Sequence, residues 1–357
     1  MWGENRIAGI DLARGLAVIG MLAAHLFALP AFDLLRPGTW GGIADGRSSI
    51  LFALLAGVSI ALVTGGRTPV QGAARSLAAR RLAVRALVLW VIGILLVLTT
   101  VPVYVILPAY AILFLLAVPL IGASGGVLLT LAAVLALVTP WILPLLDDLP
   151  VWTAPGGAEL FLALGWAYPF PVWITFIVAG MAIGRSDLRS ASTAVTLVAV
   201  GVALAAVSGM AETLLPSPVD AYVAEVLSAQ PHSSGILEVV GSGGAAVAVL
   251  GLCLLVGRTP ATTVLLPLRA VGSMPLTAYA GQIVAWAIVA ALTIGRIPDL
   301  EAFRALGLFW PFVVGTLVFA TAWALWRGRG PLEALVGRLV AWVVPPGAGG
   351  GPSRLER

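Results

Sequence analysis

One apolar segment near the N-terminus carries three ionisable side chains, Asp11, Arg14 and His25. Arg14 and His25 are 11 residues apart. At about 100° per residue this is three helical turns plus some 20°, so both side chains lie on one helix face roughly 16 Å apart. In such a helix the arginine can bind an anion, and a neutral imidazole can accept a proton at neutral pH. The structural alternative is that Asp11 pairs with Arg14 and that His25 is a hydrogen-bonded core residue.

Two further polar groups are expected at the same end of the molecule as His25. The first begins the next apolar segment and consists of Asp45, Arg47 and Ser48. Helix capping explains Asp45 and an interfacial side chain explains Arg47, but together with His25 they would form the wall of an acceptor pocket. The second is His232, six residues before Glu238, at the start of a later apolar segment. These two residues would bind the acceptor or orient the catalytic histidine.

Polar residues near the other end are candidates for an anionic ligand. The arginine run before the third apolar segment includes Arg80, Arg81 and Arg85. Its simplest role is to fix topology, but it could also attract a nucleotide phosphate. Ser273 begins a segment near residues 272–293 in which Gln282 is embedded, and such an amide either joins helices or lines a channel. The glycine-rich run at 241–244 is most simply a close helix-packing surface rather than a phosphate cradle.

Composition restricts the elements that can position these side chains. Of the 357 residues, 60% are hydrophobic and 10% are charged, whereas about a quarter of an ordinary soluble domain is charged. Apolar runs of about 20 residues, long enough to cross ~30 Å of hydrocarbon as helices, recur along the chain. The sequence therefore predicts an all-α polytopic membrane bundle without a soluble catalytic domain. The single cysteine, Cys253, excludes a disulfide within the chain and a cysteine-based metal site, and no metal is expected.

Ten membrane helices are predicted from the apolar windows. They lie near residues 8–29, 44–65, 80–99, 104–122, 125–146, 166–184, 192–211, 237–256, 272–293 and 305–326. All 20 basic residues are arginines. Four of them fall on the side of the membrane where His25 and His232 are expected. These four are Arg36, Arg47, Arg296 and Arg304. Because the other 16 fall on the opposite side, the positive-inside rule places both termini in the cytoplasm.

The bundle is expected to extend over residues 1–343. A proline at the start of residues 331–343 is compatible with a short interfacial helix. The remaining residues, 344–357, are rich in Gly and Pro and are predicted to form a disordered cytoplasmic tail.

The first helix resembles that of a known superfamily. The stretch RIAGIDLARGLAVIGMLAAH is similar to the first helix of the integral-membrane acyltransferases, which include the acyltransferase 3 proteins and the heparan-α-glucosaminide N-acetyltransferase-like proteins. In the first branch an Arg, ten residues and a His form the marked motif, and Arg14 and His25 match it. The Ile-Asp-x-x-Arg-Gly opening, the Trp-Gly-Gly before the second helix and the late Gly-Ser-Met-Pro-Leu-Thr-x-Tyr resemble the second branch. That branch has its proposed catalytic histidine just before the Trp, where this chain reads LLRPGTWGG.

The resemblance implies an acyltransferase that takes an acyl group, with acetyl as the expected one, from cytoplasmic acyl-CoA. The acceptor would be a hydroxyl or amine of a glycan or lipid-linked molecule on the outer face of a bacterial-type cytoplasmic membrane. The donor is expected to meet Arg14, Arg80, Arg81, Arg85 and Ser273. His25 would act as general base or as acyl-carrying nucleophile, and His232 is the second catalytic candidate. The acceptor side would comprise Asp45, Arg47, Ser48, Glu238 and Gln282.

The alternative function is a proton-coupled transporter or flippase of a small anionic or lipid-linked substrate, in which the first helix would carry the proton or the anion. No internal repeat and no matching pair of broken helices supports it. No nucleic-acid partner is expected, and a homodimer is left open. The sequence does not separate direct transfer from an acyl-histidine intermediate.

Overall fold

The chain is all helical. The computed structural model describes residues 6–30, 32, 36–216 and 220–345, and within them it contains sixteen α-helices, three short 3-10 helices and no strand. The predicted all-α class is confirmed. The α-helices are α1 (Ala8–Leu26), α2 (Arg47–Val63), α3 (Gly72–Val97), α4 (Leu107–Ala117), α5 (Gly125–Asp147), α6 (Gly157–Leu164), α7 (Phe170–Gly184), α8 (Ala191–Leu214), α9 (Ala221–Val226), α10 (Ile236–Val256), α11 (Ala261–Val264), α12 (Leu266–Ser273), α13 (Pro275–Thr293), α14 (Leu300–Ala305), α15 (Phe309–Trp326) and α16 (Pro331–Val343). The 3-10 helices are η1 (Pro37–Ala44), η2 (Val118–Leu120) and η3 (Pro150–Trp152).

Seven stretches of helix among the described residues are long and apolar enough to cross a membrane. They are α1, α5, α8, α10, α13, α15, and η1 taken together with α2. Three of the ten predicted spans are helical but fall outside this group. The apolar helices α4 and α7 are shorter, and α3 carries the arginine run. Each predicted span therefore coincides with a helix, and the chain is a polytopic helical membrane bundle.

Several predicted boundaries differ from the helix ends by a few residues, and two of these differences have a clear local cause. The span at 272–293 is divided because Pro275 disfavours helical backbone angles at the residue before it, and Met274 has φ −138° and ψ 57°. Helix α13 begins with Pro275, where no backbone N–H is needed. Ser273 is consequently the last residue of the short helix α12. Helix α3 begins at Gly72 rather than near residue 80, because the arginine-bearing stretch before the apolar run is also helical.

Glycines bring the central helices into backbone contact. Helix α1 packs against α2, α10 and α12. A Cβ on Gly272 of α12 would lie 1.7 Å from the carbonyl oxygen of Asp11, so α12 touches the α1 turn that carries the first charged residues. Between α2 and α7, a Cβ on Gly57 or on Gly180 would lie 2.0 Å from a carbonyl oxygen of the other helix. Small residues thus allow the close approach that membrane helices use for packing.

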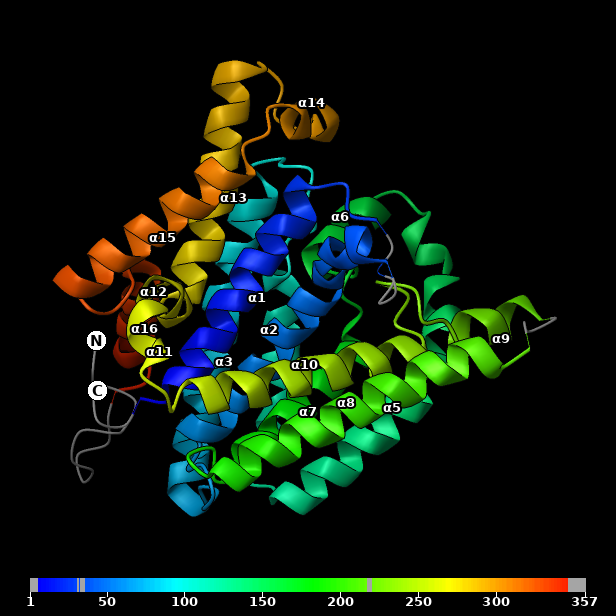
Figure 1. Cartoon of the computed structure of the whole chain (residues 1–357), viewed down its shortest axis with the longest axis vertical. Coiled ribbons are helices and arrows are strands. Elements are labelled where there is room, and N and C mark those ends of the chain that lie inside the picture. The colour runs from blue at the N-terminus through cyan, green and yellow to red at the C-terminus, as the bar shows by residue number, and fades with distance from the viewer. Residues whose placement is uncertain (1–5, 31, 33–35, 217–219, 346–357) are drawn as a thin grey trace.

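Helices α8 and α10 lie side by side across the lower part of Figure 1, while α1, α2 and α13 rise through its centre. A Cβ on Gly244 of α10 would lie 2.8 Å from the carbonyl oxygen of Gly201 in α8, and one on Gly241 would lie 2.6 Å from the Oγ of Ser208. The interpretation of residues 241–244 as a helix-packing surface is confirmed.

The two ends of the bundle differ in their polar residues. At the arginine-rich end, where α1 and α3 begin and α2 and α7 end, Arg185 donates to the carbonyl oxygen of Ile121 at 2.5 Å. At the opposite histidine end, where α1 ends and α2 and α10 begin, His232 reaches Asp45. That the arginine-rich end faces the cytoplasm stays a prediction. Of the predicted tail, residues 346–357 lie outside the described residues.

Candidate active site

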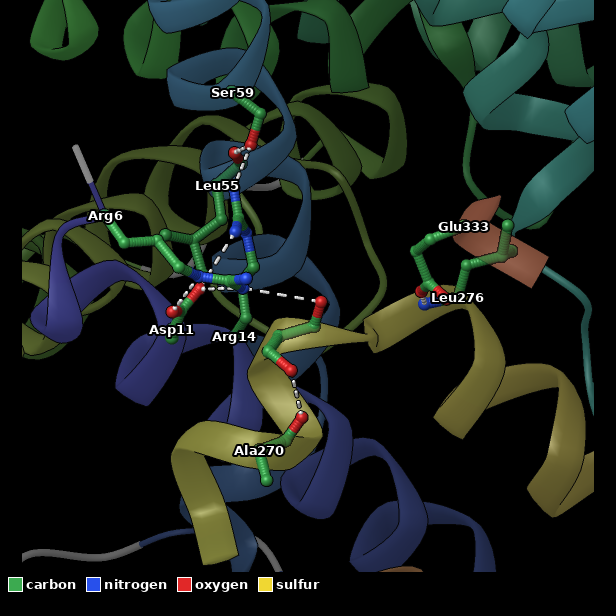
Figure 2. Close-up of polar contacts among 9 residues, drawn as sticks. Arg6, Asp11, Arg14, Leu55, Ser59, Ala270, Leu276 and Glu333 are labelled. Carbon is green, nitrogen blue, oxygen red and sulfur yellow. Dashed lines mark hydrogen bonds and ion pairs between the residues drawn. The ribbon is translucent and has the colours of Figure 1, made fainter. Parts of the chain in front are cut away.

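The first turns of α1 form an ion-pair cluster at the arginine-rich end (Figure 2). Asp11 accepts from Arg6 through Nε at 2.7 Å and Nη2 at 3.1 Å, and from Arg14 at 3.3 Å. Arg14 also donates to the Oγ of Ser59 on α2 at 2.6 Å. The buried carboxylate is thus shared by two guanidinium groups, and Arg14 joins α1 to α2. The structural alternative for Asp11 and Arg14 matches this geometry.

A cavity of about 110 Å³ opens beside this cluster. Its lining includes Ser59 and three arginines, Arg81 and Arg85 from α3 and Arg329 from the connection between α15 and α16. Apolar residues of α2, α4 and α16 complete the wall. We call this space the arginine cavity. Several guanidinium groups around one opening suit an anion with several oxygens, such as a phosphate group.

The structure separates the predicted donor residues. Arg81 and Arg85 line the arginine cavity, and Arg14 reaches its edge through Ser59. Arg80 is exposed and is not part of the lining. The Ser273 hydroxyl donates to the carbonyl oxygen of Ala270 at 2.7 Å within its own helix. The structure therefore groups Arg81 and Arg85 around one cavity and places Arg80 and Ser273 outside its lining, and the donor-binding role of all four residues stays a prediction.

The residue Glu333 fixes α16 against α13. Its carboxylate accepts from the backbone N–H group of Leu276 at 2.8 Å (Figure 2). It also accepts from the backbone N–H group of Thr277 at 3.1 Å and from the Thr277 hydroxyl at 2.5 Å. A carboxylate at a helix N-terminus is favoured by the free N–H groups and by the helix dipole. Helix α16 is thereby held over the arginine cavity, which three of its residues line.

At the histidine end, a second cavity of about 170 Å³ contains the predicted acceptor residues. Its lining includes His25, Asp45, Ser48, His232 and Arg304. These residues come from the end of α1, the η1–α2 junction, the α9–α10 connection and α14. We call this space the histidine pocket. The two histidines of the chain, 207 positions apart in the sequence, thus face one space.

The carboxylate of Asp45 pairs with His232. The distance from its Oδ1 to the Nε2 of His232 is 3.1 Å, and both side chains are partly exposed. This hydrogen bond raises the pKa of the His232 imidazole above its ordinary value of ~6.5, against the effect of burial. A carboxylate that orients an imidazole and favours its protonated form is the arrangement of a general base.

Glu238 holds the loop that presents His232. Its buried carboxylate accepts from the backbone N–H groups of His232 and Ser234, each at 2.6 Å, and from the Ser233 hydroxyl at 3.4 Å. His232 and Ser234 have φ of 66° and 55°, in the left-handed region that non-glycine residues rarely adopt. The carboxylate therefore stabilises a strained loop. Glu238 is not part of the pocket lining, and its carboxylate contacts this loop; that it binds the acceptor or orients the catalytic histidine stays a prediction.

His25 is held by its backbone rather than by its ring. The Nε of Arg304 donates to the His25 carbonyl oxygen at 2.9 Å, and its Nη2 donates to that of Ala24 at 3.3 Å. Among the described residues, no side chain forms a hydrogen bond with the His25 imidazole. His25 lines the pocket without a hydrogen bond to its ring in this part of the chain, so the alternative of a hydrogen-bonded core histidine does not match this geometry, and its catalytic role stays a prediction.

Two further predicted acceptor residues, Arg47 and Gln282, also lie outside the lining of the histidine pocket. Arg47 stacks over the ring of Phe32, with its guanidinium carbon 5.2 Å from the ring centroid. Gln282 donates to the Oγ1 of Thr316 at 3.3 Å and joins α13 to α15, which is the first of its two predicted alternatives. Neither side chain lines the histidine pocket or the arginine cavity, because each is used in packing between elements.

Sequence reasoning missed the two tyrosines of the histidine pocket and one arginine in each cavity. These are Tyr104, Tyr168, Arg304 and Arg329. The two arginines were interpreted as topology markers only. An arginine beside a membrane span gives the same sequence signal whether its side chain faces solvent or a cavity, so the pattern alone could not identify them.

A comparison with protein families matches residues 6–213 to the family described as heparan-alpha-glucosaminide N-acetyltransferase, catalytic. The chain belongs to this family. The acetyltransferase family thus accounts for α1 to α8, including His25, Asp45 and the third-helix arginines. Residues 183–343 match a second family, described as a protein of unknown function (DUF418). Searches of curated proteins and of solved structures each returned no match.

The two matched regions meet at both cavities. His232, Arg304 and Arg329 lie outside the region matched by the acetyltransferase family and inside the second region. Both cavities are therefore completed by residues from the C-terminal half, and neither is formed by the acetyltransferase-matched region alone.

Proposed function

We propose that this protein is a membrane acyltransferase that moves an acyl group from acyl-CoA at the arginine-rich end to an acceptor in the histidine pocket. The acyl group proposed is acetyl. The acceptor would be a hydroxyl or amine of a glycan or lipid-linked molecule. The observation that carries the proposal is the pair of cavities at opposite ends of one bundle, one cationic and one with an imidazole–carboxylate pair. Membership of an acetyltransferase family supports the same reaction.

The donor would bind through its phosphates at the arginine cavity. Arg81, Arg85 and Arg329 offer planar guanidinium groups, which can form two parallel hydrogen bonds with one phosphate. Arg14 is committed to Asp11 and Ser59, so its role would be to hold the α1–α2 wall of the cavity. The cytoplasm, which contains the cell's acyl-CoA, would then lie at this end, in agreement with the positive-inside rule.

The acceptor would enter the histidine pocket from the opposite side. A volume of about 170 Å³ is smaller than the ~300–1,000 Å³ of pockets that enclose a whole small ligand. Only the reacting end of a glycan or lipid-linked acceptor would therefore be enclosed. The guanidinium of Arg304, which also lines this pocket, would favour an acceptor with an anionic group near the reacting atom.

In the proposed reaction, His232 takes the proton from the acceptor hydroxyl or amine while Asp45 stabilises the imidazolium. A bond forms between the acceptor oxygen or nitrogen and the thioester carbon, and the bond from that carbon to sulfur breaks. The proton then passes from His232 to the sulfur, so the products are the acylated acceptor and free CoA. His25 would contact the acyl group, either as a hydrogen-bonding residue or as its covalent carrier.

Binding of acetyl-CoA to the purified protein in nanodiscs tests the donor site. Isothermal titration should give micromolar binding of acetyl-CoA to the wild type and weaker binding of 3′-dephospho-CoA. Arg85→Ala should reduce the affinity about tenfold or more, whereas Arg80→Ala, the matched change at an exposed neighbour, should leave it within about twofold. Failure of the wild type to bind any CoA species would favour the transporter alternative.

A further inference from the structure

The two cavities share one face of α2. Ser49 lines the histidine pocket, and Ala56 and Ser59 line the arginine cavity. These positions, together with Phe52, follow the spacing of three and four residues that marks one helix face. From Ser49 to Ala56 the helix rises about 10 Å. Phe52 lies on this helix face between Ser49 and Ala56 and lines neither cavity. Its side chain therefore lies between the histidine pocket and the arginine cavity.

A tyrosine from α4 stands opposite Phe52. The rings of Phe52 and Tyr110 stack with centroids 5.5 Å apart and an angle of 11° between their planes. Tyr110 stacks in turn on Phe114, at 6.2 Å and 15°. Phe114 lines the arginine cavity, and Tyr110 lies one turn nearer the histidine end. The paired rings of Phe52 and Tyr110 therefore form an aromatic barrier between the two cavities.

The hydroxyl of Tyr110 is buried without a partner. The residue is 3% exposed, and its oxygen has no hydrogen-bond partner among the residues that the structure describes. Tyr168, which lines the histidine pocket, lies within electrostatic range of this phenol. Buried polar groups in native proteins are nearly always hydrogen-bonded, and an unsatisfied one is destabilising. A hydroxyl at this level is suited to donate to an oxygen that a ligand carries through the barrier.

We propose that Phe52 and Tyr110 form the gate between the donor and acceptor sites, and that the Tyr110 hydroxyl binds the carbonyl oxygen of the acyl thioester. The inference rests on the proposed function, because that function requires the thioester to pass from the arginine cavity toward the histidines. The two rings separate while the extended arm of the coenzyme lies between them. The hydrogen bond to the carbonyl strengthens as negative charge develops on this oxygen during transfer.

The affinities of acetyl-CoA and CoA for the protein in nanodiscs test the proposal without an acceptor. CoA has the same phosphates and arm but no acyl carbonyl. The wild type should bind acetyl-CoA roughly 5- to 10-fold more tightly than CoA, because the carbonyl satisfies the Tyr110 hydroxyl. In Tyr110→Phe, which keeps the ring, the ratio should fall to about 1. Tyr222→Phe removes a hydroxyl that donates to the Trp141 carbonyl oxygen, and because neither residue lines a cavity, this variant should keep the wild-type ratio.

The outcomes separate the gate from the function. If the wild type binds neither CoA species, the proposed function fails. If it binds both and Tyr110→Phe keeps the wild-type ratio, only the role of Tyr110 fails. Because Tyr110→Phe removes an unsatisfied buried hydroxyl, the variant should fold and should unfold at a temperature no lower than that of the wild type. Phe52→Ala provides a second test, since an opened gate should increase acetyl-CoA hydrolysis in the absence of acceptor, and an unchanged hydrolysis rate would overturn the gate.

Discussion

Replacement of Glu238 tests whether its carboxylate holds His232 in place. The backbone N–H groups of His232 and Ser234 donate to this buried carboxylate at 2.6 Å each. Hydrogen bonds to charged groups are worth ~1.5–3 kcal/mol each. Glu238→Ala should therefore lower the local stability of the loop by ~3–6 kcal/mol and release the positive φ at both residues.

Amide hydrogen exchange measures this loss directly. Because ~1.4 kcal/mol corresponds to a tenfold change in an equilibrium constant, exchange of residues 232–234 should accelerate about 10²- to 10⁴-fold in Glu238→Ala. Acyl transfer should decrease with it, since His232 would no longer be aligned with Asp45. Glu225→Ala, at an exposed position of the neighbouring helix α9, is the matched control and should change neither quantity. Wild-type exchange at residues 232–234 in Glu238→Ala would refute the role assigned to the carboxylate.

Three further predictions concern the pocket and the bundle. The hydrogen bond to Asp45 raises the pKa of His232, so the pair stabilises the fold fully below pH ~6.5 and loses this contribution as the pH rises through the folded-state pKa. Asp45→Asn should therefore remove this pH dependence from unfolding temperatures measured across pH 6–9. An unchanged pH profile in the variant would contradict the prediction. Arg185 donates to four backbone carbonyl oxygens at the arginine-rich end, so Arg185→Ala should lower the free energy of unfolding, measured by chemical denaturation, by ~3 kcal/mol or more. Arg67→Ala, which removes one partner of an exposed surface ion pair, should lower it by less than ~1 kcal/mol. Equal losses in the two variants would contradict the structural role of Arg185. Gly57→Ala should lower the unfolding temperature, because its Cβ would lie 2.0 Å from the Ile177 carbonyl oxygen. Gly281→Ala should leave the unfolding temperature unchanged, because there is open space around Gly281. Similar unfolding temperatures for the two variants would argue against close α2–α7 packing.

Much of the fold could be predicted because membrane helices are local features of the sequence. Runs of apolar residues indicated the seven described helical stretches that are long and apolar enough to cross a membrane, and each of the ten predicted spans coincides with a helix. The spacing of Arg14 and His25 correctly assigned them to one helix, near its opposite ends. The division at Pro275 was also encoded locally, because the residue before a proline disfavours helical angles. The N-terminal extent of α3 was not predicted, because arginines are good helix formers but do not contribute to an apolar window.

The candidate site was predictable only in part because its contacts join distant segments. Asp45 and His232 are separated by 187 residues, and no pattern in the sequence indicates that this carboxylate pairs with His232 rather than contacting His25. Glu238 carries the same sequence signal whether it contacts an acceptor or the backbone of a loop. Gln282 likewise could have lined a channel, and only the position of Thr316 on α15 assigns it to helix packing.

Transfer of a labelled acetyl group across a sealed membrane tests the central claim most directly. The protein is reconstituted into proteoliposomes in one orientation, verified by labelling an engineered cysteine, with radiolabelled acetyl-CoA on one side and a mixture of glycan and lipid-linked acceptors on the other. The account predicts labelled acceptor, and equal amounts of free CoA on the donor side, only when acetyl-CoA is at the arginine-rich end, with a reduction of about 10²- to 10⁴-fold in His232→Ala. Transfer that requires acetyl-CoA at the histidine end, or that is unaffected by His232→Ala, would contradict it.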